Sequence, residues 1–383
     1  MKSERMPRQV PVERCNRGEP IISPTSNWWE TSVTFNAAAV YLERSAANDP
    51  VIRALLPMRT LADPALADGV VAIHYRARPE SDPGSPFGRS FIGLAVFTPG
   101  FELLYRYQEP VLFPSPDPQG IDALGVEDPR ITRLGDAFYM VYCGVAPDPA
   151  TTWRARLCVA TSKNLVHWEK HGPLPGDLNA HNNKDGVLFP DLVDGRYYLL
   201  HRPFWAGLPM PEYAIRLAVS DSPLATWKDC GVVLRAFANP QHRSSWVGAG
   251  SVPIPMGDGR YAVIYHTGNF HNEADREYDL DAAGFDFSAY DPQRPESIVT
   301  GRLEHLMVPQ TPAELRSHSA LMVGNVLFAC GSYEYQGDIY IIYGGADTYT
   351  LAARVDKQAL FAALDQADLE NPFAHCPRQP QRG

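Results

Sequence analysis

The chain is organised around one stretch, Gly125-Val126-Glu127-Asp128-Pro129-Arg130-Ile131-Thr132, which runs directly into Arg133-Leu134-Gly135-Asp136-Ala137-Phe138-Tyr139-Met140-Val141-Tyr142. The second part predicts a hairpin: a short strand, a Gly-Asp turn and an aromatic-rich strand. The first part places two adjacent carboxylates beside a proline, immediately before that strand. Such a position is typical of acid chemistry on carbohydrates. Taken alone, the same four residues 127–130 also fit a salt-bridged turn in which Arg130 only neutralises Asp128.

The hairpin pattern recurs along the chain. A turn followed by a strand that ends in an aromatic residue or a histidine occurs at 68–76, 135–142, 194–202, 258–266 and 337–344. A polar cluster that opens a strand precedes each copy, at 35–37, 127–130, 184–190, 248–253 and 324–328. A further strand follows each copy, at 91–97, 155–162, 214–220, 280–287 and 349–355. The repeat therefore predicts units of three or four antiparallel strands.

About five such units predict an all-β fold, a five-bladed β-propeller with extended loops. Two stacked β-sandwiches are the alternative. A propeller brings the starts of its innermost strands together at one end of a central channel, so the polar clusters would converge on one pocket. Helix-like spacing is confined to 357–370, which predicts a short C-terminal helix.

We expect one domain over 1–383, because neither end of the chain has the pattern of a second one. Residues 1–27 are expected to form an N-terminal extension, and residues 357–383 a C-terminal helix and tail.

The composition limits the classes of partner. The chain has 383 residues, a formal net charge of −10, 45% hydrophobic and 20% charged residues, which predicts a folded protein that binds neither nucleic acid nor an anionic membrane. No signal-peptide pattern and no long apolar run is present, so we expect a cytoplasmic location. The six cysteines form no CxxC pair. We expect reduced thiols, no metal site and no cofactor.

Five motifs occur in an order that resembles glycoside hydrolase family 130, a group of mannoside-specific five-bladed propellers. They are Glu127-Asp128-Pro129-Arg130, Leu188-Phe189-Pro190, His201-Arg202-Pro203, Tyr265-His266 and Tyr343-Gly344-Gly345-Ala346-Asp347-Thr348. The resemblance covers about residues 29–355. Most members of that family are phosphorylases, and some are inverting β-mannosidases.

The resemblance implies a role for each matching residue. Asp128 corresponds to the general acid, which in the phosphorylases is proposed to protonate the glycosidic oxygen through the 3-hydroxyl of the bound mannose. The implied phosphate-binding residues are Lys184, Arg202 and His266. The implied substrate-binding residues are Asn36, Glu127, Arg130, Asp185, Tyr265 and Asp347.

Two positions depart from the family's pattern. Lys184 stands where several phosphorylases have an arginine, and a lysine holds a phosphate as a point charge rather than by a bidentate contact. Asp191 follows the Phe-Pro pair where many members have a glutamate, which bears on the carboxylates available to a hydrolytic variant.

We therefore expect an inverting glycoside phosphorylase that uses inorganic phosphate as co-substrate. It would cleave a β-mannosidic bond of an oligosaccharide and give α-mannose 1-phosphate and a shortened acceptor sugar. An inverting β-mannosidase on the same fold and a non-catalytic sugar-binding propeller are the alternatives. The sequence leaves open the linkage (β-1,2 or β-1,4), the acceptor sugar and whether the chain forms a homo-oligomer.

Overall fold

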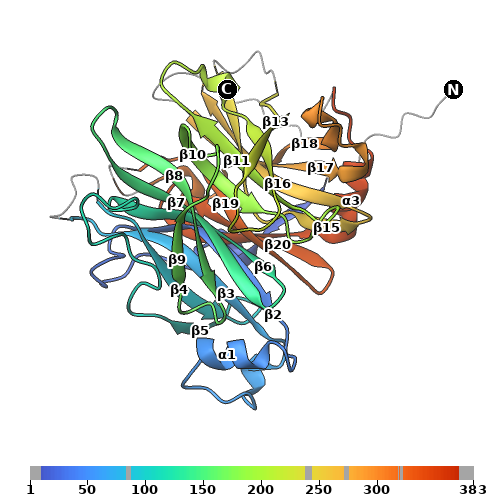
Figure 1. Cartoon of the computed structure of the whole chain (residues 1–383). Coiled ribbons are helices and arrows are strands. Elements are labelled where there is room, and N and C mark those ends of the chain that lie inside the picture. The colour runs from blue at the N-terminus through green and yellow to red at the C-terminus, as the bar shows by residue number, and fades with distance from the viewer. Residues whose placement is uncertain are drawn as a thin grey trace, which may run out of the picture.

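The computed structural model describes residues 10–82, 88–237, 244–270, 276–317, 319 and 322–370, and these residues form five antiparallel sheets. The sheets are arranged around a common centre as the blades of a β-propeller (Figure 1). In four of the five pairs of neighbouring blades the first strands contact each other, which places these strands innermost. The predicted all-β, five-bladed propeller with a short C-terminal helix is confirmed.

In blades 1 to 4 the strands of the main sheet follow one another in the chain from the inside outwards. Blade 1 contains β2 (Val33–Leu42), β3 (Val70–Arg78), β4 (Phe91–Phe97) and β5 (Leu103–Arg106). Blade 2 contains β6 (Gly125–Leu134), β7 (Ala137–Asp148), β8 (Thr152–Ser162) and β9 (Glu169–Pro173). Blade 3 contains β10 (Asn182–Leu188), β11 (Tyr197–Phe204), β12 (Ile215–Ser220) and β13 (Lys228–Leu234).

The last two blades are less regular. Blade 4 contains β14 (Ser244–Ala249), β16 (Arg260–Phe270), β17 (Arg276–Asp286) and β18 (Val299–Met307), with the short β15 (Ile254–Gly257) paired to β16. Blade 5 contains β19 (Leu327–Tyr335), β20 (Asp338–Gly345) and β21 (Tyr349–Asp356). Its outermost strand is β1 (Val12–Arg14), from the other end of the chain.

The repeated Gly-containing turns explain why the hairpins form. Asp194–Gly195, Asp258–Gly259 and Gln336–Gly337 have positive φ at both residues. This is the backbone of a type I′ turn, which matches the twist of antiparallel strands and favours Asp and Gly. These Gly-containing turns therefore favour the hairpins that recur from blade to blade.

Strand β1 closes the ring, because it pairs with β21 through Val12↔Val355 and Arg14↔Ala353. It lies within residues 1–27, where the sequence shows no strand pattern. A strand of three residues is too short to display alternation. Blade 5 is thus assembled from both ends of the chain.

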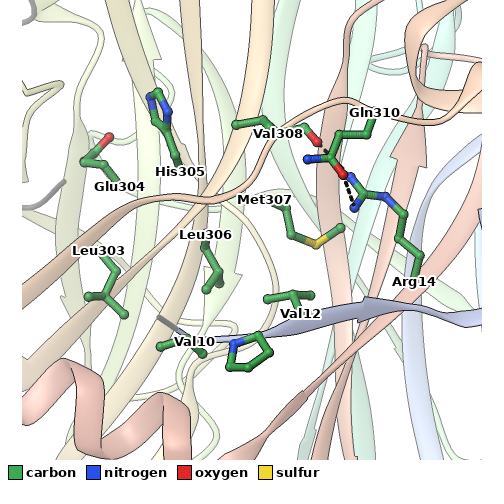
Figure 2. A pocket seen from close by; sticks show the side chains of 11 residues that line it. Val10, Val12, Arg14, Leu303, Glu304, His305, Leu306, Met307, Val308 and Gln310 are labelled. Carbon is green, nitrogen blue, oxygen red and sulfur yellow. Dashed lines mark hydrogen bonds between the residues drawn. The ribbon is translucent and has the colours of Figure 1, made fainter. Parts of the chain in front are cut away.

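Arg14 links β1 to the segment after β18 through hydrogen bonds. Its guanidinium donates to Glu314 Oε1 at 2.7 Å, to the Gln310 side chain at 3.1 Å and to the Val308 carbonyl at 2.7 Å. Figure 2 shows Arg14, Val308 and Gln310 at the rim of a cavity of about 270 Å³ between β1 and β18, with Val12 and Met307 in its lining.

We expect Arg14→Met to destabilise the fold by about 3 kcal/mol, since the carboxylate of Glu314 is completely buried and would lose its cation. Urea unfolding of both proteins measures this difference. Lys163→Met is the control, because Lys163 pairs with Asp136 on the exposed surface and should change stability by about 0.5 kcal/mol or less. Equal effects of the two substitutions would show that Arg14 does not secure the ring.

Three α-helices lie outside the described sheets. α3 (Lys357–Asp365) follows β21 and packs on β17 and β18, where the sequence predicts a helix. α1 (Asp49–Leu55) and α2 (Pro312–Leu315) are additions to the prediction, which confined helical spacing to 357–370. With seven and four residues, both are too short to show a helical period. Figure 1 shows α1 beyond β5, away from α3.

Candidate active site

Three inner strands carry a β-bulge with a polar residue near their start, and β19 carries one without a polar residue with positive φ, where the register shifts between Ala329 and Gly331. The register shifts between Phe35 and Ala38 in β2, between Glu127 and Arg130 in β6 and between Lys184 and Val187 in β10. Each of the bulges in β2, β6 and β10 contains one short polar residue with positive φ: Asn36 (46°), Asp128 (51°) and Asp185 (58°). Asn and Asp tolerate this backbone better than other non-glycine residues. A bulge re-aims side chains, so these strand starts can gather polar groups.

Asp128 is anchored by one of its two carboxylate oxygens. Oδ1 accepts hydrogen bonds from Asn36 Nδ2 at 2.9 Å and from Arg76 Nη1 at 3.1 Å. Oδ2 accepts none from any residue in the described part of the chain, although the residue is only 4% exposed. An orientated carboxyl group with one free oxygen is suited to proton transfer.

Arg76, on β3, joins the two adjacent carboxylates. It donates to Glu127 Oε1 at 2.6 Å as well as to Asp128. Burial favours the neutral form of Glu127, but Arg76 and Lys184 outweigh burial and lower its pKa to about 2. Glu127 is therefore an ionised partner of two cations. Sequence analysis missed Arg76, although it directly follows the aromatic Tyr75 of the repeat at 68–76, much as Arg202 directly follows His201 in the repeat at 194–202.

Lys184 and Arg202 face each other across β10 and β11 in the strand register. The Lys184 amine donates to Glu127 Oε2 at 3.1 Å, and its side chain is 24% exposed. Burial alone would lower the pKa of Lys184, but Glu127 and Asp128 outweigh it and raise the pKa above its usual range. Arg202 uses Nε to bind Asp185 at 2.7 Å. Its two terminal nitrogens make no hydrogen bond to a described residue, so both cations retain free donors.

The buried carboxylate of Asp185 orients several basic side chains of the cluster. Besides Arg202, it accepts from Arg130 Nη2 at 3.3 Å, and His266 Nε2 lies 3.5 Å from its Oδ2. Burial favours its neutral form, but Arg202 and His266 outweigh burial and hold its pKa well below the usual range. Gly248 makes this approach possible, because a Cβ there would lie 2.2 Å from Asp185 Oδ2 and 2.4 Å from His266 Nε2.

Asp347 differs from the other carboxyl groups of the cluster, because burial prevails over the nearby cations and disfavours its ionised form. Burial raises its pKa to about 6, which Arg76 opposes and Asp128 reinforces. It follows β20 in blade 5, so the cluster draws on blades 1, 2, 3 and 5 together with His266 of blade 4. A carboxyl group of this kind can exchange a proton near neutral pH.

We expect Asp347→Asn to stabilise the fold at pH 7.5 by about 3 kcal/mol and at pH 4 by only about 0.5 kcal/mol. The folded chain keeps the Asp347 proton up to a pKa of about 6, whereas the unfolded chain releases it near 3.8. The wild type therefore loses stability relative to Asp347→Asn as the pH rises from about 4 to 6, because the unfolded chain ionises this carboxyl and the folded chain does not. Urea unfolding at both pH values measures the effect. An equal difference between the proteins at both pH values would contradict the raised pKa.

The structure does not bring every sequence-predicted residue to this cluster. Tyr265 points to the other side of β16, where its hydroxyl donates to Glu304 and accepts from Arg302 at 3.0 Å.

His266 and Arg130 do reach the cluster, but both are buried. His266 is 0% exposed and lies against Asp185 and the Phe328 ring. Arg130 is almost completely buried and donates to the Asp128, Ala249 and Gly250 carbonyls as well as to Asp185.

Asp191, the departure from the family's pattern, lies outside the cluster. It is exposed and accepts a hydrogen bond from the Tyr261 hydroxyl at 3.1 Å. Within the described residues, no group of three His, Cys, Asp or Glu side chains is arranged to hold a metal ion. No helix among those residues combines the length and apolar character needed to span a membrane.

Comparison with known proteins agrees with this geometry. The model of glycoside hydrolase family 130, described as beta-1,4-mannooligosaccharide phosphorylase, matches residues 70–366. The chain is 30% identical over 333 residues to a 1,2-beta-oligomannan phosphorylase of Thermoanaerobacter sp. (strain X514), covering 86% of this chain and 92% of that protein. It is 28% identical over 354 residues to a beta-1,2-mannobiose phosphorylase of the same organism, with 89% and 96% covered.

A solved structure shares the fold. The beta-1,2-mannobiose phosphorylase of Listeria innocua, in complex with beta-1,2-mannobiose, superposes with a TM-score of 0.68 at 21% identity, over 93% of this chain and 99% of that one. Taken with the family match over most of the propeller, these findings show that the chain belongs to glycoside hydrolase family 130, as an enzyme of the mannoside phosphorylase type.

Proposed function

We propose that the chain is an inverting phosphorylase that transfers a β-linked mannosyl unit from an oligosaccharide to inorganic phosphate. One observation carries the proposal: the free oxygen of Asp128 belongs to the same network as two basic side chains with unused donors, Lys184 and Arg202. A proton donor and an anion site are the two parts that phosphorolysis requires.

In the proposed reaction, phosphate forms a bond to C1 of the mannose as the bond from C1 to the glycosidic oxygen breaks. Asp128 supplies the proton to that oxygen, so the acceptor sugar leaves with a free hydroxyl group. The electron pair comes from phosphate, which Arg202 and Lys184 orient and partly neutralise. The products are α-mannose 1-phosphate and an acceptor shortened by one unit.

Two of the other carboxylates, Glu127 and Asp185, favour phosphate over water as the nucleophile. An inverting hydrolase needs a second carboxylate as base, and an efficient base has a pKa near the working pH. The pKa of Glu127 is about 2 and that of Asp185 is held well below its usual range, so both are weak bases. Glu127 is also bound to Arg76 and Lys184.

A β-mannosidase is the second candidate, and Asp347 is the observation that favours it. Its pKa of about 6 is suited to activating a water molecule. We place Asp347 as a substrate-binding group in the phosphorylase, and as the base if the enzyme proves to be hydrolytic.

An end-product assay separates these candidates. We propose β-1,2-mannobiose as the first substrate, because two of the similar phosphorylases are named for β-1,2-linked mannosides. β-1,4-Mannobiose is the second, following the description of the family model. Mannose 1-phosphate formed only in the presence of phosphate would support phosphorolysis. Free mannose formed at the same rate without phosphate would overturn it and direct attention to Asp347.

A further inference from the structure

Aromatic side chains lie beside the basic pair, at the end of blades 2 and 3 where the bulges gather. Trp153 is the second residue of β8, His181 directly precedes β10, Phe204 ends β11 and Trp205 follows it. We call these four residues the aromatic shelf. Trp153 is 36% exposed and Trp205 is 38% exposed. Large apolar rings left in contact with water in this way often mark a binding surface.

The shelf is continuous with the candidate active site. In the β10–β11 register, Lys184 is opposite Arg202 and Asn182 is opposite Phe204, so Phe204 lies one side-chain repeat further from the basic pair. The Arg202 guanidinium carbon is 5.5 Å from the centre of the Phe204 ring. The Phe204 and Trp153 rings are 6.3 Å apart. The contacts therefore lead from Arg202 through Phe204 to Trp153, and Trp205 adjoins them as the residue after Phe204 in the chain.

The outer part of the shelf is held in position before any ligand binds. His181 and Trp205 stack with their rings 4.4 Å apart and 29° from parallel. Arg154 donates to the carbonyls of Asn179 at 2.6 Å and Ala180 at 3.0 Å, which fixes the segment leading to His181. A rigid aromatic surface binds with less loss of conformational entropy.

We propose that the aromatic shelf binds the acceptor side of the oligosaccharide, from the third sugar unit onwards. This rests on the proposed function. The mannose that is cleaved must reach Asp128, which is only 4% exposed, so every further sugar has to extend outwards from the cluster. The C–H faces of a pyranose stack on aromatic rings, and the exposed faces of Trp153 and Trp205 suit such contacts. The enzyme would then prefer oligosaccharides to the disaccharide.

A matched control is available on blade 1. Trp28 is 54% exposed and its ring contacts Phe91, with centres 5.3 Å apart. Among the described residues, no ring or cation contact connects Trp28 to Arg202 or Lys184. Loss of Trp28 removes a similar exposed ring without touching the shelf.

The test compares phosphorolysis of β-1,2-mannotetraose and β-1,2-mannobiose by the full chain. We expect the wild type to show a higher kcat/KM on the tetraose. Trp153→Ala and Trp205→Ala should each lower the ratio of tetraose to biose kcat/KM about three- to tenfold. Trp28→Ala should leave the ratio as in the wild type. An unchanged ratio in both shelf variants, or an equal drop in Trp28→Ala, would overturn the proposal.

A binding measurement tests the role of the aromatic shelf independently of the proposed function. If the wild type forms no mannose 1-phosphate from either substrate, the proposed function fails. The affinity for β-1,2-mannotetraose, measured by calorimetry, then decides on the shelf. A three- to tenfold weaker Kd for Trp205→Ala than for Trp28→Ala would support it, and equal Kd values would overturn it.

Discussion

Asp128→Asn is expected to lower kcat/KM for β-mannobiose phosphorolysis by about 10²- to 10⁴-fold, the usual contribution of a general acid. The asparagine keeps an oxygen to accept from Asn36 and Arg76, so the site should stay assembled. It cannot give a proton to the leaving sugar. Initial rates of mannose 1-phosphate formation measure the loss, and a thermal unfolding curve checks the fold.

A substrate that needs no proton tests the reason for this loss. 2,4-Dinitrophenyl β-mannoside releases a phenolate that is stable without protonation, so Asp128→Asn should lose less than about tenfold on it. Asp136→Asn is the control for a lost carboxylate, since Asp136 is exposed and lies in the turn at the other end of β6 from its bulge. Equal losses on both substrates would show that Asp128 acts in binding or folding and not as the acid.

Arg202→Lys should raise KM for phosphate by about 10- to 100-fold, because a bidentate charge-assisted contact contributes about 1.5–3 kcal/mol. Lysine leaves a positive charge for the buried Asp185, which is bound at 2.7 Å by Arg202 Nε. It removes the two terminal nitrogens that are free to bind phosphate. Phosphate saturation curves at constant disaccharide measure the change.

Two comparisons make this result specific. KM for the disaccharide should change much less than KM for phosphate, since the loss is at the anion site. Arg196→Lys, at an exposed arginine paired loosely with Asp221, should change neither constant. An unchanged phosphate KM in Arg202→Lys would contradict the role of this arginine in phosphate binding.

Local sequence signals were sufficient to predict the blades but not their closure. The Asp-Gly turns at 194–195 and 258–259 determine hairpins within a few residues, so the repeat is visible in the sequence. The pairing of β1 with β21 joins residues more than three hundred positions apart. Nothing in the three residues of β1 indicates its partner, and α1 is likewise too short to show a period.

Bulges explain which site predictions the structure brings together. Neighbouring residues of a regular strand point to opposite faces. The shifts in β6 and β10 suspend this rule, so Glu127 and Asp128, and likewise Lys184 and Asp185, all join one network. β16 pairs with β14 and β17 without a shift. Tyr265 therefore points away from the side that His266 faces, a separation that alternation alone predicts.

The role of Arg76 could not be predicted from the sequence, because its contacts are distant in the chain. Arg76 binds Glu127 and Asp128 from a different blade, 51 and 52 positions away in the chain. Its importance follows from the two carboxylates that it holds, which become neighbours only in the folded propeller. The local signal that points to it is an arginine at the same place in two of the five repeats, Arg76 and Arg202.

The central claim is that phosphate, and not water, attacks C1 of the mannose. Proton NMR during the first turnovers of β-1,2-mannobiose in phosphate buffer tests it most directly, because it identifies the first product before mutarotation. If β-1,2-mannobiose is turned over, we predict α-mannose 1-phosphate as that product, with no free mannose released from the cleaved unit. Two molecules of free mannose for each bond cleaved, with no mannose 1-phosphate and at a rate independent of phosphate, would contradict the claim.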